Sequence, residues 1–143
     1  MPQNGLFRPN AKGNFTDKKR LMNLSAFNSF CDLLPHSFHV VQWGGVHVWK
    51  VGGMKGKMFA LAFPELQKQL AITFKVSPMS YDILKEQEGL RPAPYLASRG
   101  MTWIQRVSNE TMDDDALQDY LAESHRLCGL ALPKRVQMDL GLV

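Results

Sequence analysis

Residues 46–63 read VHVWKVGGMKGKMFALAF and place two alternating patterns on either side of a glycine-rich, basic connector. Successive side chains of an extended chain point to opposite faces, so the alternation predicts strands over 46–51 and 57–63. The positive φ angles that a hairpin loop of this length needs are expected at Gly52, Gly53 and Gly56. The stretch therefore predicts a two-stranded antiparallel ribbon with a cationic end.

The same alternation assigns side chains to the two faces of the ribbon. One expected core row holds His47, Trp49 and Val51, and the other holds Phe59, Leu61 and Phe63. Away from the core we expect Val48, Lys50, Met58, Ala60 and Ala62.

Outward from the ribbon, the chain alternates short strand and helix patterns. Further strands are predicted over 39–43, 70–76 and 101–107, with an irregular, proline-containing segment at 89–100. Helices are predicted from Thr16 to Leu34, from the N-cap Ser77 to Gly89, and from a capping box at Thr111 and Asp114 to a stop before Pro133. This order predicts an α+β fold with a single antiparallel sheet of about five strands and helices on one face. The other face is then open to solvent or to a partner.

Length and composition bound the organisation of the chain. The 143 residues fit one domain, predicted at 16–143 after a flexible tail at 1–15 that is poor in apolar periodicity. Two distant cysteines, the lack of an apolar signal core and the lack of a membrane-length apolar run predict a cytoplasmic protein without membrane contact. The net charge of +4 favours anionic partners such as nucleic acid.

Motifs for catalysis or metal binding are missing from the sequence. His36 and His39 have an HxxH spacing, but a proline precedes them and no cluster of cysteines or carboxylates completes a ligand set. The chain has no GxSxG, Walker, HExxH or GxGxxG motif, and most carboxylates fall on predicted helices, where solvation and capping explain them. We therefore expect no enzyme activity, no metal and no cofactor.

Basic and aromatic residues give the more specific indication. Lys50 and Lys75 are expected on the same face away from the core, two strands and about 10 Å apart, with the small Ala60 between them. A face of this kind can approach a phosphate backbone. Further candidates for nucleic-acid contact are Lys55 and Lys57 in the hairpin, Arg91, Arg99 and Arg106 in the last loop and strand, and Tyr95 and Trp103 as partly exposed stacking residues. Protection of a sheet edge and ordinary packing are the alternative explanations.

Several blocks of the sequence resemble the MmcQ/YjbR family. They are LPHSFHVVQWGG, VWKVGGMKGKMFAL, ITFKVSP, RPAPYLASRGMTWIQ and a terminal amphipathic helix ending in LPKR, and together they span residues 24–135. The resemblance implies an α+β fold with an antiparallel sheet, related to frataxin-like architecture, and a double-wing arrangement for which a DNA-binding role is proposed. It brings no catalytic residue with it.

Individual positions carry the resemblance. Lys50, Lys57 and Lys75 match recurrent lysines of the family, and Pro94, Tyr95 and Trp103 match its PAPY block and the tryptophan that follows. The hairpin reads GGMKGKMF where the family has GGKMF. Iron handling, which frataxin-like architecture suggests, would need an acidic first helix, yet Asp17 and Asp32 are the only acids there.

The sequence thus predicts a non-enzymatic DNA-binding module whose affinity comes from phosphate contacts. The alternative is a protein-interaction or small-ligand-binding module that uses a pocket between Arg91 and Trp103.

Overall fold

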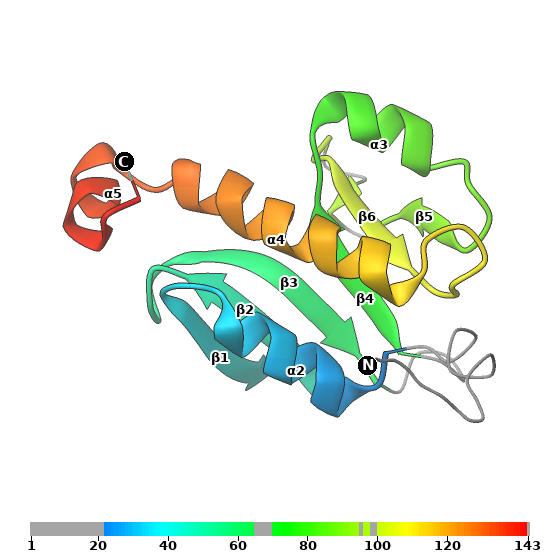
Figure 1. Cartoon of the computed structure of the whole chain (residues 1–143), viewed down its shortest axis with the longest axis horizontal. Helices are drawn as coiled ribbons and strands as arrows, with labels where there is room; N and C mark the ends of the chain where they lie inside the picture. The colour runs from blue at the N-terminus through cyan, green and yellow to red at the C-terminus, as the bar shows by residue number, and fades with distance from the viewer. Residues whose placement is uncertain (1–21, 65–69, 95, 98–99, 143) are drawn as a thin grey trace, which may run out of the picture.

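A computed structural model describes residues 22–64, 70–94, 96–97 and 100–142. It contains one open antiparallel sheet of six strands with helices packed against it, which confirms the predicted α+β class (Figure 1). The predicted tail at 1–15 and the helix start at Thr16 lie outside the described residues. Within the described ranges, no helix is both long and apolar enough to cross a membrane.

The sheet has the strand order β1-β2-β3-β4-β6-β5, and all neighbours are antiparallel. Its strands are β1 (Ser37–Gln42), β2 (Val46–Val51), β3 (Lys57–Phe63), β4 (Ala71–Lys75), β5 (Leu90–Pro92) and β6 (Trp103–Arg106). The hairpin β2–β3 has the bounds predicted from its alternation. The short loops of the first four strands give a meander, as antiparallel neighbours allow.

Strand β5 was missed by the sequence prediction, which treated residues 89–100 as irregular. Its residues pair with β6 from Leu90, opposite Arg106, to Pro92, opposite Ile104. A proline is tolerated there because β5 is an edge strand, and one side of its backbone has no strand to bond.

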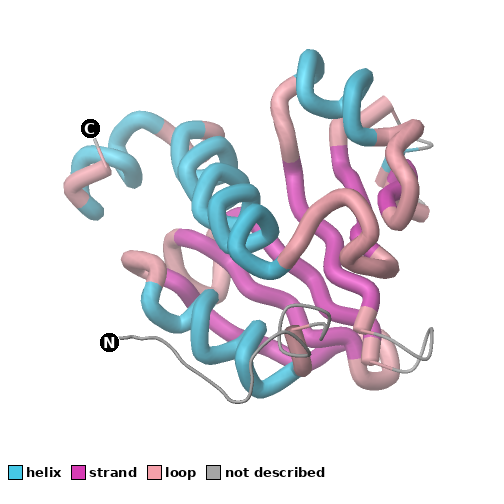
Figure 2. The backbone as a smooth tube through the Cα atoms, turned by 45° about the vertical axis from the view of Figure 1, so that its right-hand side comes forward, coloured by secondary structure: helices cyan, strands magenta, loops and turns pink. Residues whose placement is uncertain are grey.

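Two helices cover one face of the sheet (Figures 1 and 2). Helix α4 (Asp114–Leu130) packs across β2, β3 and β4, and α2 (Leu24–Leu33) packs on β1 and β3. The shorter α3 (Pro78–Leu84) contacts β5 and β6. Beyond the end of α4, Pro133 starts a further helix, α5 (Lys134–Leu140), which the sequence analysis did not predict. We call the side covered by α2 and α4 the helix face and the other side the second face.

The helix caps agree with the sequence in one case and differ in another. Ser77 accepts a hydrogen bond from the Ser80 amide at 3.2 Å, which confirms it as the cap of α3. The predicted capping box of Thr111 and Asp114 is wrong, because Asp113 caps α4 by accepting from the Ala116 amide at 2.9 Å. Because the N-cap is Asp113, two residues beyond Thr111, Asp114 is free for another partner.

A β-bulge interrupts the pairing of β2 with β3. Trp49 lies opposite Ala60, whereas the next residue, Lys50, lies opposite Met58. Phe59 is therefore the extra residue of the bulge and has no partner in β2. The bulge directs Phe59 to the helix face, where its ring meets the ring of His125 in α4 edge to face at 5.1 Å.

Ser124 of α4 repairs the sheet beside this bulge. Its hydroxyl donates to the Phe59 carbonyl at 2.6 Å and accepts from the Lys75 amide at 2.9 Å. These two bonds connect β3 and β4 through the helix at the end of their direct pairing, so a side chain satisfies backbone groups that the bulge leaves unpaired.

The bulge also overturns the predicted core row of Phe59, Leu61 and Phe63. Leu61 pairs with Val48 and Thr73 and therefore lies on the second face, together with Phe63, while Phe59 lies on the helix face. Alternation fails here because a bulge adds one residue to the period of two.

The main core lies between the sheet and the helix layer. It includes Phe27 and Cys31 from α2, Trp49, Phe59 and Phe74 from the strands, and Leu117, Leu121 and Cys128 from α4. Burial raises the pKa of both thiols, Cys31 and Cys128, above the ordinary value, so they act as apolar packing residues.

Candidate functional site

Two complete rows of side chains cross all six strands, one on each face. The helix-face row is His39, Trp49, Ala60, Phe74, Ile104 and Pro92. The second-face row is Val40, Val48, Leu61, Thr73, Gln105 and Arg91. Cross-strand partners share a face, so these rows fix the orientation of every strand away from the bulge.

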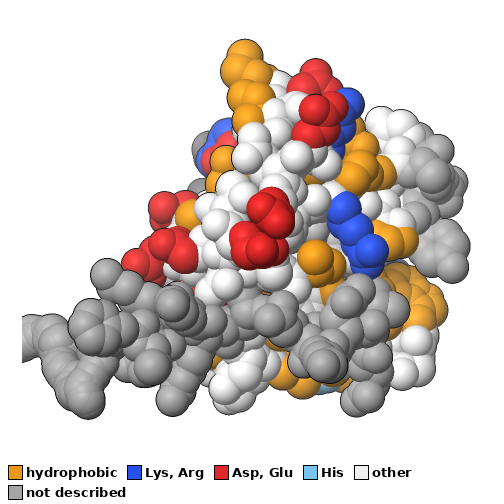
Figure 3. Space-filling model, turned by 90° about the vertical axis from the view of Figure 1, so that its right-hand side faces the viewer, with side chains coloured by type: hydrophobic (Ala, Val, Ile, Leu, Met, Phe, Trp, Pro, Cys, Tyr) orange, Lys and Arg blue, Asp and Glu red, His pale blue; other side chains and the backbone are white. Residues whose placement is uncertain are grey.

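The sign of the charged side chains differs between the strands and the other elements. On the six strands all of them are cations, namely Lys50, Lys57, Lys75, Arg91 and Arg106. The described carboxylates all come from helices and turns. In Figure 3, acidic side chains lie at the top, centre and left, while Lys and Arg side chains lie at the right and next to acidic side chains at the top and upper left. Three of the five strand cations, Lys50, Lys75 and Arg91, lie on the second face by strand register, whereas Arg106 and Lys57, which pairs with Val51, lie on the helix face.

The argument from the net charge of the whole chain does not hold for the described residues taken alone. Seven of the 17 Lys and Arg and two of the 13 Asp and Glu fall outside the described residues, so the described part carries ten cations and eleven carboxylates. A positive potential at the surface of the described part therefore requires that cations and carboxylates lie in different places, because the cations are not in excess.

Lys50 and Lys75 lie on the second face, as the sequence predicted, but with a different residue between them. The cross-strand partner of Lys50 is Met58, whereas the predicted neighbour, Ala60, lies on the helix face. The ammonium group of Lys50 donates to the Met54 carbonyl at 3.1 Å, which leaves two of its hydrogens for another partner.

The hairpin loop presents Lys55, and Lys57 follows it as the first residue of β3, opposite Val51; both lysines are exposed. Gly52 and Gly53 have the predicted positive φ angles, 96° and 87°. Gly56 does not, and it is needed for another reason, since a Cβ at this position would collide with the Val51 carbonyl oxygen. The loop is a compact turn with one exposed lysine in it and another at the start of the next strand.

Arg91 is held by a ladder of polar side chains on the second face. Its Nε and Nη2 donate to the Gln105 side-chain oxygen at 2.9 and 2.6 Å, and Gln105 donates to the Thr73 hydroxyl at 3.0 Å. Gln105 and Thr73 are buried, so the guanidinium of Arg91 is the half-exposed end of a buried network.

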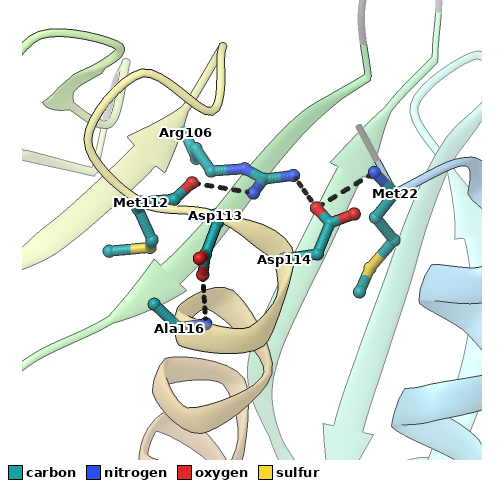
Figure 4. Close-up of polar contacts among 6 residues, drawn as sticks. All are labelled: Met22, Arg106, Met112, Asp113, Asp114 and Ala116. Atoms are coloured by element: carbon teal, nitrogen blue, oxygen red, sulfur yellow. Dashed lines mark hydrogen bonds and ion pairs between the residues drawn. The ribbon is translucent and has the colours of Figure 1, made fainter. Parts of the chain in front are cut away.

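Arg106 does not fit the predicted contact with nucleic acid. Its side chain is buried at 1% exposure on the helix face, where it donates to Asp114 at 2.9 Å and to the Met112 carbonyl at 3.0 Å (Figure 4). Asp114 also accepts from the Met22 amide at 3.1 Å. Burial lowers the pKa of Arg106, while the hydrogen bond to Asp114 raises it. This arginine ties the start of α4 to β6.

The predicted stacking residue Trp103 is also buried. Its exposure is 3%, and it lies on the second face opposite Lys75. The expectation that Trp103 is partly exposed is wrong, because β6 is an internal strand and this side chain belongs to the buried core cluster. Tyr95 and Arg99 lie outside the described residues.

The alternative prediction was a pocket between Arg91 and Trp103, and the structure has a groove on the second face that takes only Pro94 and Leu96 from the described part of that segment. It has a volume of about 510 Å³ and is lined by Trp43, Val46, Met58, Leu61, Phe63, Pro94 and Leu96. Trp43 lies in the turn between β1 and β2 with a φ of 49° and is 64% exposed. The two glycines after it were the available signal, because they indicate a turn and not a strand end at this tryptophan.

The histidines form a hydrogen-bonded cluster on the helix face. His39 and His47 approach to 2.9 Å between ring nitrogens, and the Asn28 side chain accepts from the Trp49 indole at 2.9 Å and lies 3.5 Å from His47. Burial, followed by His47, lowers the pKa of His39. In the part of the chain that the structure describes, no three histidine, cysteine or carboxylate side chains come together as metal ligands.

Comparisons with known proteins agree on the fold. The family model YjbR matches residues 33–127. A crystal structure of Deinococcus radiodurans protein DR2400, with the domain DUF419, has a TM-score of 0.73, is 24% identical, and covers 88% of this chain and 93% of that chain. A comparison with curated proteins gives no match. At this identity the solved structure shows the fold alone.

Proposed function

This chain belongs to the YjbR family, and from the charge pattern of its sheet we propose that it is a non-enzymatic module that binds DNA through phosphate contacts. The observation that carries the proposal is that every charged side chain on the strands is a cation. Lysine and arginine contacts to phosphate are independent of sequence and supply most of non-specific affinity.

The proposed interface consists of Lys50 and Lys75 on the second face, Lys55 and Lys57 in the hairpin, and Arg91. Lys55 and Lys57 are exposed, and the other three are partly exposed. Arg91 keeps its orientation through Gln105, so it can meet a phosphate without losing much side-chain entropy. Arg106 and Trp103 are left out of the interface because both are buried.

The test is a salt titration of binding to duplex DNA. Replacement of Lys50, Lys57 and Lys75 together by Gln should weaken binding to all sequences alike. It should also reduce the slope of log affinity against log salt by about 2.7, since each phosphate contact contributes about 0.9. The matched control replaces Lys85, Lys134 and Arg135, which lie on α3 and α5 and not on this face.

The control variant has the same net charge as the test variant, so it separates position from total charge. Equal slopes in the two folded variants would contradict the proposed interface. A wild-type protein that does not bind DNA at low salt would end the proposal. We further propose a cytoplasmic location, which the free and buried state of Cys31 and Cys128 supports.

A second candidate function, small-ligand binding, is favoured by a separate observation, the apolar groove on the second face. Its volume lies in the range of small-molecule sites.

A further inference from the structure

The groove has a floor and two walls of different origin. Its floor comes from second-face side chains of β2 and β3, including Leu61 and Phe63. One wall is the exposed Trp43 in the β1–β2 turn, and the other is Pro94 and Leu96 in the connection from β5 to β6. Three separate parts of the chain thus enclose one continuous apolar space.

Among the residues that the structure describes, the lining offers one hydrogen-bonding side-chain group, the indole N–H of Trp43. The other described lining residues are apolar. The backbone of β3 is paired with β2 from Lys57 to Ala62 apart from the bulged Phe59, and with β4 from Ala60 to Phe63. A peptide or a nucleic-acid base in this space would leave polar groups without hydrogen-bond partners, which is unfavourable. An aliphatic chain has no such groups, so the lining selects for it.

One end of the groove is cationic. Met58 forms the floor at this end, and its cross-strand partner is Lys50. Lys75, which pairs with Trp103, lies on the same face of β4, and both lysines adjoin the lining without being part of it. No strand carries a carboxylate that would repel an anion. From Phe63 to Met58 the floor extends about 15 Å along β3 at the usual rise of a strand.

We propose that this groove binds a long-chain aliphatic carboxylate, with its chain along Leu61 and Phe63 and its head group beside Lys50 and Lys75. The arrangement matches a molecule that is apolar along its length and carries one negative charge at its end. This inference goes beyond DNA binding and does not depend on it, although both functions would use Lys50 and Lys75.

The experiment is isothermal titration calorimetry of the full chain with dodecanoate, at concentrations below micelle formation. Wild type should bind dodecanoate at one saturable site. Replacement of Lys50 and Lys75 by Gln should weaken dodecanoate binding by about tenfold, as expected for loss of charge-assisted hydrogen bonds. The same variant should bind the uncharged dodecan-1-ol as wild type does.

Two further variants test the groove itself. Val46→Phe fills the space and should weaken the binding of both ligands by more than tenfold. Trp43→Ala removes an exposed wall without touching the core, and it should weaken both ligands even if Val46→Phe does not fold. A control with Lys134 and Arg135 replaced by Gln has the same charge change on α5 and should bind dodecanoate normally.

Three results would overturn the inference. They are the absence of saturable dodecanoate binding to wild type, unchanged affinity in the folded groove variants, and unchanged affinity in the variant of Lys50 and Lys75. Because the titration contains no nucleic acid, failure of DNA binding leaves these outcomes unaffected.

Discussion

The two faces of the sheet are built from the same six strands, yet they differ in chemistry. Across the helix face run aromatic and small apolar residues such as Trp49, Ala60 and Phe74, which α2 and α4 cover. Across the second face run apolar groove residues, then the ladder of Thr73, Gln105 and Arg91. Several second-face side chains, among them Val48, Leu61 and Gln105, are buried like those of the helix face. Partly exposed groove residues such as Met58 and Phe63 are the ones available for binding, so substitutions at Phe63 and at the helix-face Phe59 should have different effects.

Phe59 and Phe63 give the sharpest contrast, because they lie on one strand and face opposite sides. Phe59 is fully buried against α4, so Phe59→Ala should destabilise by about 3–5 kcal/mol. Phe63 is partly buried in the groove wall, so Phe63→Ala should cost at most about half as much. Urea unfolding curves measure both. Equal losses would mean that the faces are not distinct.

Loss of the hydrogen bonds of Ser124, which connect α4 to β3 and β4, should have the next largest effect on stability. Ser124→Ala removes the hydroxyl that joins the Phe59 carbonyl to the Lys75 amide, and two buried backbone groups lose their partner. We expect a loss of about 1–3 kcal/mol in unfolding free energy. Ser29→Ala, on the exposed side of α2, is the control and should change stability little. If Ser124→Ala matches it, the helix does not repair the sheet.

Histidines on the helix face should make stability depend on pH. Burial lowers the pKa of His125, and its ring nitrogen contacts the Pro35 carbonyl at 2.7 Å, a bond that works in the opposite direction. Its folded pKa lies below the unfolded value of 6.5, so its contribution is complete above that pH and is lost as the pH falls.

We therefore expect a lower melting temperature at pH 5.5 than at pH 7.5. His125→Gln should reduce this difference, while the part due to His39, whose pKa is also lowered, should remain. A melting temperature that rises on acidification would contradict the sign.

The smallest effect is expected at the thiols of the core. Burial raises the pKa of Cys31 and Cys128, so few thiolates form at neutral pH. Labelling of the native protein with iodoacetamide should be slow, and it should become fast in denaturant. Rapid labelling of either cysteine in the folded state would show a reactive site that the structure does not explain.

Local patterns in the sequence predicted much of this fold. Alternation and glycines fixed the β2–β3 hairpin, and Ser77 before a proline fixed the start of α3. The bulge at Phe59 could not be predicted, because it depends on α4, which is distant in the sequence and supplies Ser124 as a partner. For the same reason alternation placed Leu61 on the wrong face.

The candidate site was predicted less completely than the fold. Lys50 and Lys75 were correctly placed on one face, since strand alternation is local. Arg106 was misassigned, because its partner Asp114 looked like a helix cap. The groove depends on Trp43 and Leu96, which meet only when the sheet is assembled, and no local pattern contains that information.

The central claim is that the second face and its hairpin, and not the helix face, meet an anionic partner. Chemical-shift mapping of ¹⁵N-labelled protein with a short DNA duplex at low salt tests it most directly. We predict that the largest shifts occur at Lys50, Lys55, Lys57 and Lys75, with little change along the exposed sides of α2 and α4. Shifts concentrated on those helices, with the hairpin unaffected, would contradict the claim.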